Sequence, residues 1–177
     1  MLTIVDYGAG NVPSVERAFY RLGVQTRRAF LPDDLREASA LVLPGVGHFA
    51  ALTRALRDRH LAPALRTALA SGTPFLGICL GMHVLYEGSA EAPGEQGLGL
   101  FRGRVNALPP AVKLPHMGWN QVRQKTVHPI FEGIPDEANF YFVHSYYALP
   151  EDMSVVVGLT GYHGHVLGQC VVGVDKV

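Results

Sequence analysis

The chain has 177 residues, of which 48% are hydrophobic and 17% are charged, and its 15 basic side chains balance 15 acidic ones. This length predicts one domain with a core of its own, and the composition is that of a globular protein. The balanced charge argues against binding to nucleic acid or to an anionic membrane. The two cysteines, Cys79 and Cys170, are too few for a disulfide framework, so we expect a reducing, cytoplasmic environment.

The first half of the chain alternates short apolar runs with longer helical patterns. Leu2–Val5 predicts a buried strand and not a signal peptide, because no basic segment precedes it. Apolar residues recur at helical spacing from Val12 to Leu22, and Ala40–Leu43 predicts the next strand. Two further helices are predicted, over Phe49–Arg59 and Leu61–Ala70.

The stretch from Thr67 to Tyr86 carries no charged side chain and is long enough to cross a bilayer. Glycines and a proline interrupt it, so it predicts a helix end, a turn, a strand over Pro74–Ile78 and a second turn rather than a membrane span. The uncharged strand indicates a sheet buried on both faces. A short helix is expected after it, from Met82 to Tyr86.

After Gly88, frequent glycine and proline residues predict hairpins and a mixed sheet. No repeat or linker divides the chain, so residues 1–177 are predicted to form one domain. The alternation of strands and helices predicts the α/β class, with an open, mostly parallel mixed sheet and helices on both of its faces. Strands of the second half are expected at Leu98–Phe101, Val105–Leu108, Asn139–Val143 and Ser154–Leu159.

The strongest local motif is GICLG, residues Gly77–Gly81, between a predicted strand and a predicted helix. This is the pattern of a nucleophile elbow with Cys79 in place of a serine. At the amino end of a helix the dipole lowers a thiol pKa, and the Leu80 amide points to where an oxyanion would form. The same five residues also fit a small buried cysteine among glycines.

Two further glycine motifs follow strands. Residues Pro44–Phe49, PGVGHF, could turn a backbone amide toward a developing negative charge, or could form an ordinary strand-to-helix turn. Residues Asp6–Asn11, DYGAGN, have the first two glycines of a dinucleotide-binding fingerprint but not the third. Nucleotide binding is therefore not expected at this opening loop.

Together with Pro115–Asn120 (PHMGWN) and Phe142–Tyr147 (FVHSYY), these motifs resemble the class I, triad-type glutamine amidotransferases from Leu2 to about Leu159. The likeness implies a flavodoxin-like α/β fold. The opening loop and PHMGWN resemble in particular the branch whose members supply ammonia to a (β/α)8-barrel cyclase in histidine biosynthesis. The resemblance thus implies glutamine as substrate, a heterodimer with the cyclase, and no cofactor or metal.

The resemblance also implies a role for each matching residue. Cys79 attacks the side-chain amide of glutamine, forms a thioester and releases ammonia. The oxyanion lies between the Leu80 amide and the amides of Val46 and Gly47. The residues expected to contact the substrate are Gly45, His83, Glu91, His144, Ser145 and Tyr146. The residues expected to face the cyclase are Asn11, Met117, Trp119 and Tyr141.

Two departures from the family pattern stand out. His83 occupies a position where the family usually has glutamine, and an imidazole donates a hydrogen bond with a different reach and charge. The family motif Phe-His-Pro-Glu-Lys, whose histidine and glutamate complete the triad, has no counterpart between about Thr160 and Val177. We therefore expect an atypical or truncated C-terminal part, impaired activity, and a shifted reading frame or truncation as the cause.

The tail allows another interpretation, since His163, His165 and Cys170 could suggest a metal site. No fourth ligand is visible, so exposed imidazoles are expected instead. Two alternatives to a glutaminase stay open: a catalytically silent subunit that docks on the same cyclase, and a glutaminase component of another amidotransferase. A His-x-Glu pair after residue 160 would separate the glutaminase from the silent subunit.

Overall fold

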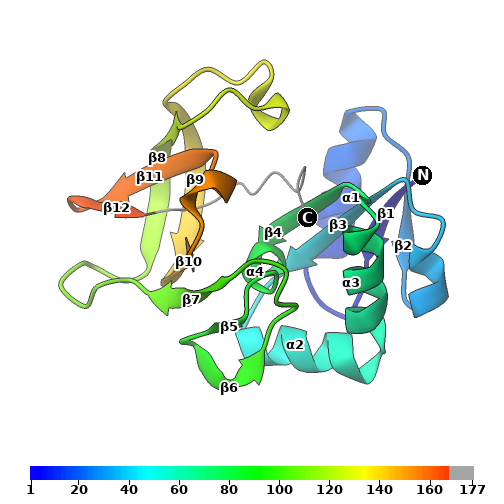
Figure 1. Ribbon diagram of the computed structural model, residues 1–177. Helices are drawn as coiled ribbons and strands as arrows, with labels where there is room; N and C mark the ends of the chain where they lie inside the picture. The colour runs from blue at the N-terminus through cyan, green and yellow to red at the C-terminus, as the bar shows by residue number, and fades with distance from the viewer. Residues whose placement is uncertain (168–177) are drawn as a thin grey trace.

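The computed structural model of the protein describes residues 1–167. The first half of the chain forms a four-stranded sheet in the order β2-β1-β3-β4 (Figure 1). Every neighbouring pair in this sheet is parallel, as the strand and helix alternation predicts. The strands are β1 (Leu2–Val5), β2 (Thr26–Ala29), β3 (Ala40–Gly45) and β4 (Phe75–Cys79).

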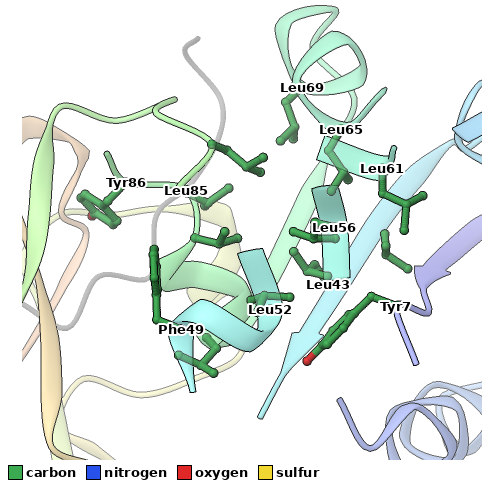
Figure 2. Packing of buried hydrophobic residues seen from close by; sticks show 14 of the residues in the cluster. Tyr7, Leu43, Phe49, Leu52, Leu56, Leu61, Leu65, Leu69, Leu85 and Tyr86 are labelled. Atoms are coloured by element: carbon green, nitrogen blue, oxygen red, sulfur yellow. The ribbon is translucent and has the colours of Figure 1, made fainter. Parts of the chain in front are cut away.

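The helices of the first half are α1 (Val12–Arg21), α2 (Phe49–Asp58), α3 (Leu61–Ala70) and α4 (Leu80–His83). Helix α1 covers one face of the parallel sheet, and α2 and α3 cover the other. Successive strand residues point to opposite faces, so each face has its own apolar side chains. On one face Val12 of α1 packs with Ile4 and Val42. On the other face the leucines of α2 and α3 pack with Leu41 and Leu43. Figure 2 shows Leu43 among these leucines.

The second half forms two further four-stranded sheets. The sheet β10-β7-β5-β6 is mixed, since β5 and β7 pair in parallel and the other pairs are antiparallel. The sheet β12-β11-β8-β9 is antiparallel and lies apart from the parallel sheet (Figure 1). The strands are β5 (Gly88–Ser89), β6 (Ala92–Gln96), β7 (Gly103–Ala107), β8 (His116–Gln124), β9 (Ala138–His144), β10 (Tyr146–Pro150), β11 (Gly158–Tyr162) and β12 (His165–Leu167).

Three 3₁₀ helices complete the described elements: η1 (Pro32–Leu35), η2 (Pro129–Phe131) and η3 (Met153–Val155). One buried hydrophobic cluster joins the parallel sheet to the mixed sheet. It contains Leu52 and Leu56 of α2 together with Tyr86, Val105 and Ala148 from the second half. Figure 2 shows Tyr86 and Leu85 on the same side of this cluster as Phe49. The two halves of the described chain are therefore packed against one another through apolar side chains.

The sequence predictions for β1, α2, α3 and β9 are confirmed to within about two residues at each end. Three others are wrong in part. The helix expected from Met82 to Tyr86 is the single turn α4, which begins at the elbow and ends at His83. Leu98–Phe101 forms no strand beyond an isolated bridge of Phe101, and the segment from Ser154 begins as η3 before β11.

The expectation that the β4 strand is buried on both faces is also wrong. Leu76 and Ile78 are 37% and 38% exposed. Leu76 lies beside Val42 in the sheet, on the face that α1 covers, but the cluster under α1 is built from β1 and β3. In the described part of the chain β4 is an edge strand of the parallel sheet, as β2 is at the other end.

No helix in residues 1–167 has the length and apolar character that crossing a bilayer requires.

Candidate active site

Cys79 lies at the sharp turn between β4 and α4. Its φ is 57°, in the left-handed region, where a residue with a side chain is strained. Glycines allow this turn to pack closely. A Cβ on Gly45 or Gly77 would press against the backbone of Gly81, and a Cβ on Gly81 would overlap the carbonyl oxygen of Leu43. The structure thus has the strained strand-to-helix turn of a nucleophile elbow.

The environment of Cys79 raises the pKa of its thiol. Burial by neighbouring atoms is the main cause, the hydrogen bond from the Leu80 amide opposes it, and the nearby Glu91 carboxylate adds to the rise. The expectation of a lowered thiol pKa is therefore wrong. Because α4 is a single turn, its dipole is too small to offset desolvation and the carboxylate.

Backbone amides from two loops lie at the end of β4. The Leu80 amide donates a hydrogen bond to the Cys79 thiol. Gly45, the last residue of β3, is the register partner of Cys79, so Val46 and Gly47 follow at the same end of the sheet. The Val46 amide donates to the Tyr7 hydroxyl at 3.3 Å. The amides that the resemblance assigns to the oxyanion therefore lie at the same end of the sheet as Cys79, and one of them is engaged by Tyr7.

Besides burial, the negative charge of Glu91 raises the pKa of the Cys79 thiol. Its Oε2 accepts a hydrogen bond from the backbone amide of Phe49 at 2.8 Å. Phe49 is the first residue of α2, so this carboxylate lies at the positive end of that helix. A carboxylate anchored in this way is suited to bind a substrate ammonium group.

An apolar cavity of about 500 Å³ opens between β4 and β9, and Cys79, His83 and His144 all line it. His83 is only 5% exposed, and its burial, with a smaller effect of His144, lowers its pKa to about 4. At neutral pH this imidazole is uncharged and offers one donor and one acceptor nitrogen. Gly45, Glu91 and the backbone after His144 lie outside the lining of this cavity.

The segment His144–Tyr146, which the resemblance assigns to substrate binding, connects β9 to β10. The Ser145 carbonyl accepts a hydrogen bond from the Leu108 amide at 2.9 Å. Tyr146 pairs with Ala107 of β7. This segment, here called the wall, is therefore attached to the mixed sheet by backbone hydrogen bonds.

Strands β8 and β9 present an exposed apolar and aromatic face. Met117 is paired with Val143, and Trp119 with Tyr141, whose rings meet edge to face at 5.7 Å. The side chain of Trp119 is 72% exposed. Asn11, also exposed, adopts a left-handed conformation just before α1. An exposed aromatic cluster of this kind is typical of a protein interface.

Two residues of this region received no role from the sequence. Tyr7 contacts the Val46 amide, and His116 lies 2.8 Å from His144. Both lie in motifs noted in the sequence, Tyr7 in DYGAGN and His116 in PHMGWN. Their positions in these motifs are the sequence signal that points to a role. The partner of each is far away along the chain, so the contact itself is visible only in the fold.

Within residues 1–164, the Leu80 amide is the one group that hydrogen-bonds the Cys79 thiol. Besides burial, the charge of His163 lowers the pKa of His116, so His163 lies near β8 rather than at the elbow. Cys170 and the side chain of His165 lie outside the described residues, so the suggested metal site stays untested.

The sequence matches the family described as glutamine amidotransferase class-I over residues 3–168. A solved structure described as a glutamine amidotransferase superposes with a TM-score of 0.72 at 16% identity, over 93% of this chain and 86% of that one. The chain belongs to the class-I glutamine amidotransferase family.

Two curated relatives within this family share one name. Over 162 residues the chain is 44% identical to the imidazole glycerol phosphate synthase subunit HisH of Dehalococcoides mccartyi, which covers 92% of this chain and 79% of that protein. It is 49% identical to the protein of the same name from Thermococcus kodakarensis, over 92% of this chain and 78% of that one.

Proposed function

We propose that this chain is the glutamine-hydrolysing subunit of an imidazole glycerol phosphate synthase and delivers ammonia to a (β/α)8-barrel cyclase in histidine biosynthesis. The observation that carries the proposal is Cys79 on a strained elbow, beside a cavity that His83 and His144 also line. The names of the curated relatives support it. We place the reaction in the cytoplasm, where a thiol nucleophile stays reduced.

In the proposed reaction the Cys79 sulfur attacks the side-chain carbonyl carbon of glutamine. The thiol proton passes to the amide nitrogen, the C–N bond breaks and ammonia leaves, and water then hydrolyses the remaining glutamyl thioester to glutamate and free thiol. The Leu80 amide, with an amide of Val46 or Gly47, stabilises the oxyanion. Glu91 binds the substrate ammonium, and the wall binds the other end of glutamine.

Proton transfer to the departing ammonia is the step that most requires a general acid or base. Residues 1–164 place no side chain in hydrogen-bond contact with the Cys79 thiol, so the contributions that the structure describes are an oxyanion site and substrate binding. Triad enzymes reduced to these contributions keep about 10³–10⁴-fold catalysis over water. We therefore expect slow glutamine turnover from the 177-residue chain, with undiminished synthesis from ammonium salts, which need only the cyclase.

The same observation favours a second candidate, a silent subunit that docks on the cyclase. A silent subunit would present the exposed face of Met117, Trp119 and Tyr141 to the cyclase without forming a glutamyl thioester on Cys79. A reactive glutamine site at Cys79 therefore favours the glutaminase.

The test uses a chloroketone analogue of glutamine, whose reactive carbon forms a bond to sulfur as chloride leaves. We expect stoichiometric modification of Cys79, mapped by peptide mass spectrometry. Glutamine at about 10 mM, above the usual KM range, should protect Cys79, and asparagine, which is one methylene shorter, should not. Labelling that glutamine and asparagine affect equally would contradict the glutamine site and support the silent subunit.

Binding to the cyclase is tested by sedimentation of the mixed subunits at micromolar concentration. We expect one complex, and Trp119→Ala should raise its Kd by about tenfold or more, because large aromatic side chains dominate interfaces. Val127→Ala, at a fully exposed residue outside the aromatic face, is the matched control. Two separately migrating species would contradict the partner assignment.

A further inference from the structure

His116 and His144 face each other as register partners in β8 and β9. Nδ1 of His116 lies 2.8 Å from Nε2 of His144, and Nδ1 of His144 lies 3.0 Å from the carbonyl oxygen of Tyr146. His116 is 3% exposed, and its ring stacks on Phe142 and Tyr162 at centroid distances of 5.1 and 4.0 Å. His116 is thus held in an apolar setting with little access to water, whereas His144 is half-buried.

These contacts give the hydrogen bonds one direction. A carbonyl oxygen can only accept, so a neutral His144 carries its proton on Nδ1 and accepts at Nε2. His116 therefore donates from Nδ1 and accepts at Nε2, which lies 3.3 Å from Nδ2 of Asn120. Burial is the main cause that lowers the pKa of both rings, in keeping with neutral forms at pH 7.

Asn120 anchors the outer end of this chain of hydrogen bonds. Its Nδ2 also donates to the Gly161 carbonyl at 2.6 Å, and its Oδ1 accepts from the Gln121 amide at 2.9 Å. Both ends of the amide are therefore assigned, and Nδ2 is the atom that faces His116. The chain runs from Asn120 through both histidines to the carbonyl of the wall.

The hydrogen-bond chain lies on one side of β8. Residues alternate along a strand, so Met117 and Trp119 lie on the opposite side of β8 from His116 and Asn120. One side carries the exposed face proposed for the cyclase. The other side holds His144, which lines the same cavity as Cys79.

We propose that His116 is a positioning residue for glutamine, because its hydrogen bond to His144 holds the wall at the place where the substrate binds. This inference rests on the proposed glutaminase function, which assigns the wall to glutamine. Loss of the His116 donor leaves Nε2 of His144 without that partner and loosens the wall. No contact of the described residues joins His116 to Cys79, so thiol reactivity itself should not change.

The test compares variants of the 177-residue chain. His116→Phe keeps an aromatic ring for stacking and removes both nitrogens, whereas His116→Asn keeps a donor close to the Nδ1 position. His60→Asn is the matched control, at an exposed histidine with a left-handed backbone just before α3. Two quantities are measured: the concentration dependence of inactivation by the glutamine chloroketone, which yields KI and a limiting rate, and the rate of Cys79 alkylation by iodoacetamide.

We expect His116→Phe to raise KI about tenfold, equivalent to about 1.4 kcal/mol, while the limiting rate and the iodoacetamide rate stay within about twofold. His116→Asn and His60→Asn should stay within about twofold of the parent KI. An unchanged KI in folded His116→Phe, an equal loss in His116→Asn, or a parallel fall in iodoacetamide reactivity would overturn the proposal.

Should His116→Phe not fold, Asn120→Ala tests the same series of hydrogen bonds at the end that is farther from the wall. It is expected to raise KI about fivefold, and an unchanged KI would overturn the proposal. If inactivation of the parent chain itself does not saturate with the chloroketone, the glutamine site of the proposed function fails, and the role of His116 fails with it. A saturating parent with unaffected variants refutes the role of His116 alone.

Discussion

The backbone amide of Val46 donates a hydrogen bond to the hydroxyl of Tyr7 at 3.3 Å, and this contact ties the opening loop to the loop proposed to stabilise the oxyanion. Gly10 provides a second contact between the loops, since a Cβ at this position would lie 2.9 Å from the Pro44 carbonyl oxygen. Tyr7 is buried and Val46 is half-exposed. The Val46 amide is therefore engaged by Tyr7, and its use at an oxyanion would require this hydrogen bond to break.

Tyr7→Phe should free this amide without changing the shape of the buried ring. One hydrogen bond is worth about 0.5–1.5 kcal/mol, so amide hydrogen exchange in residues 44–48 should become about 2–10-fold faster. Exchange is measured by peptide mass spectrometry, with Tyr20→Phe at an exposed tyrosine as control. Equal exchange in Tyr7→Phe and the parent chain would show that the contact does not hold the Val46 amide in solution.

Gly81→Ala should destabilise the chain strongly. The added methyl group would overlap the Leu43 carbonyl, and the close-packed glycines of the elbow leave no room for it to move. We expect a loss of about 2–3 kcal/mol in the free energy of unfolding, measured by urea denaturation. Gly94→Ala, where an added Cβ meets open space, should change it little, and a similar loss in both variants would contradict this account.

Glu91→Gln should lower the pKa of the Cys79 thiol. The glutamate charge raises that pKa, so its removal favours the thiolate, while a glutamine oxygen can still accept from the Phe49 amide. The pH profile of iodoacetamide alkylation should move to lower pH. Glu95→Gln, at a residue paired with Arg54, is the control. A profile that moves to higher pH would rule out this effect of Glu91.

His83 should make the stability of the protein depend on pH. Burial lowers its pKa from 6.5 to about 4 in the folded state, so the unfolded chain binds more protons between these values. The contribution of this neutral side chain is fully present above pH 6.5 and is lost as the pH falls toward 4, by about 3 kcal/mol for a shift of this size.

Urea denaturation of the parent chain and of His83→Gln at several pH values measures this effect. The glutamine side chain does not titrate, so the variant should lose less stability than the parent between pH 7 and pH 5. Parallel loss in both chains would mean that His83 is protonated as easily in the folded state as in the unfolded one.

Local patterns predict much of this protein. The apolar run of β1, the helical spacing of α2 and α3, and the GICLG turn depend on neighbours within a few residues, and these elements are present as expected. By contrast, β2 was not predicted, because Thr26–Ala29 carries two arginines. Arg27 hydrogen-bonds Thr3 of β1, and Arg28 forms a salt bridge with Glu16 of α1, so side chains from a neighbouring strand and a helix stabilise β2.

The remaining features depend on groups that only folding brings together. The thiol pKa of Cys79 rises because burial and Glu91 outweigh the short helix α4, and neither cause can be seen in the five residues of the elbow. The pairing of His116 with His144 arises from the register of β8 and β9, 28 positions apart in the chain. Backbone propensity acts over a few residues, whereas desolvation, charge and strand register act through space, so the elements were predictable and the electrostatics of the site were not.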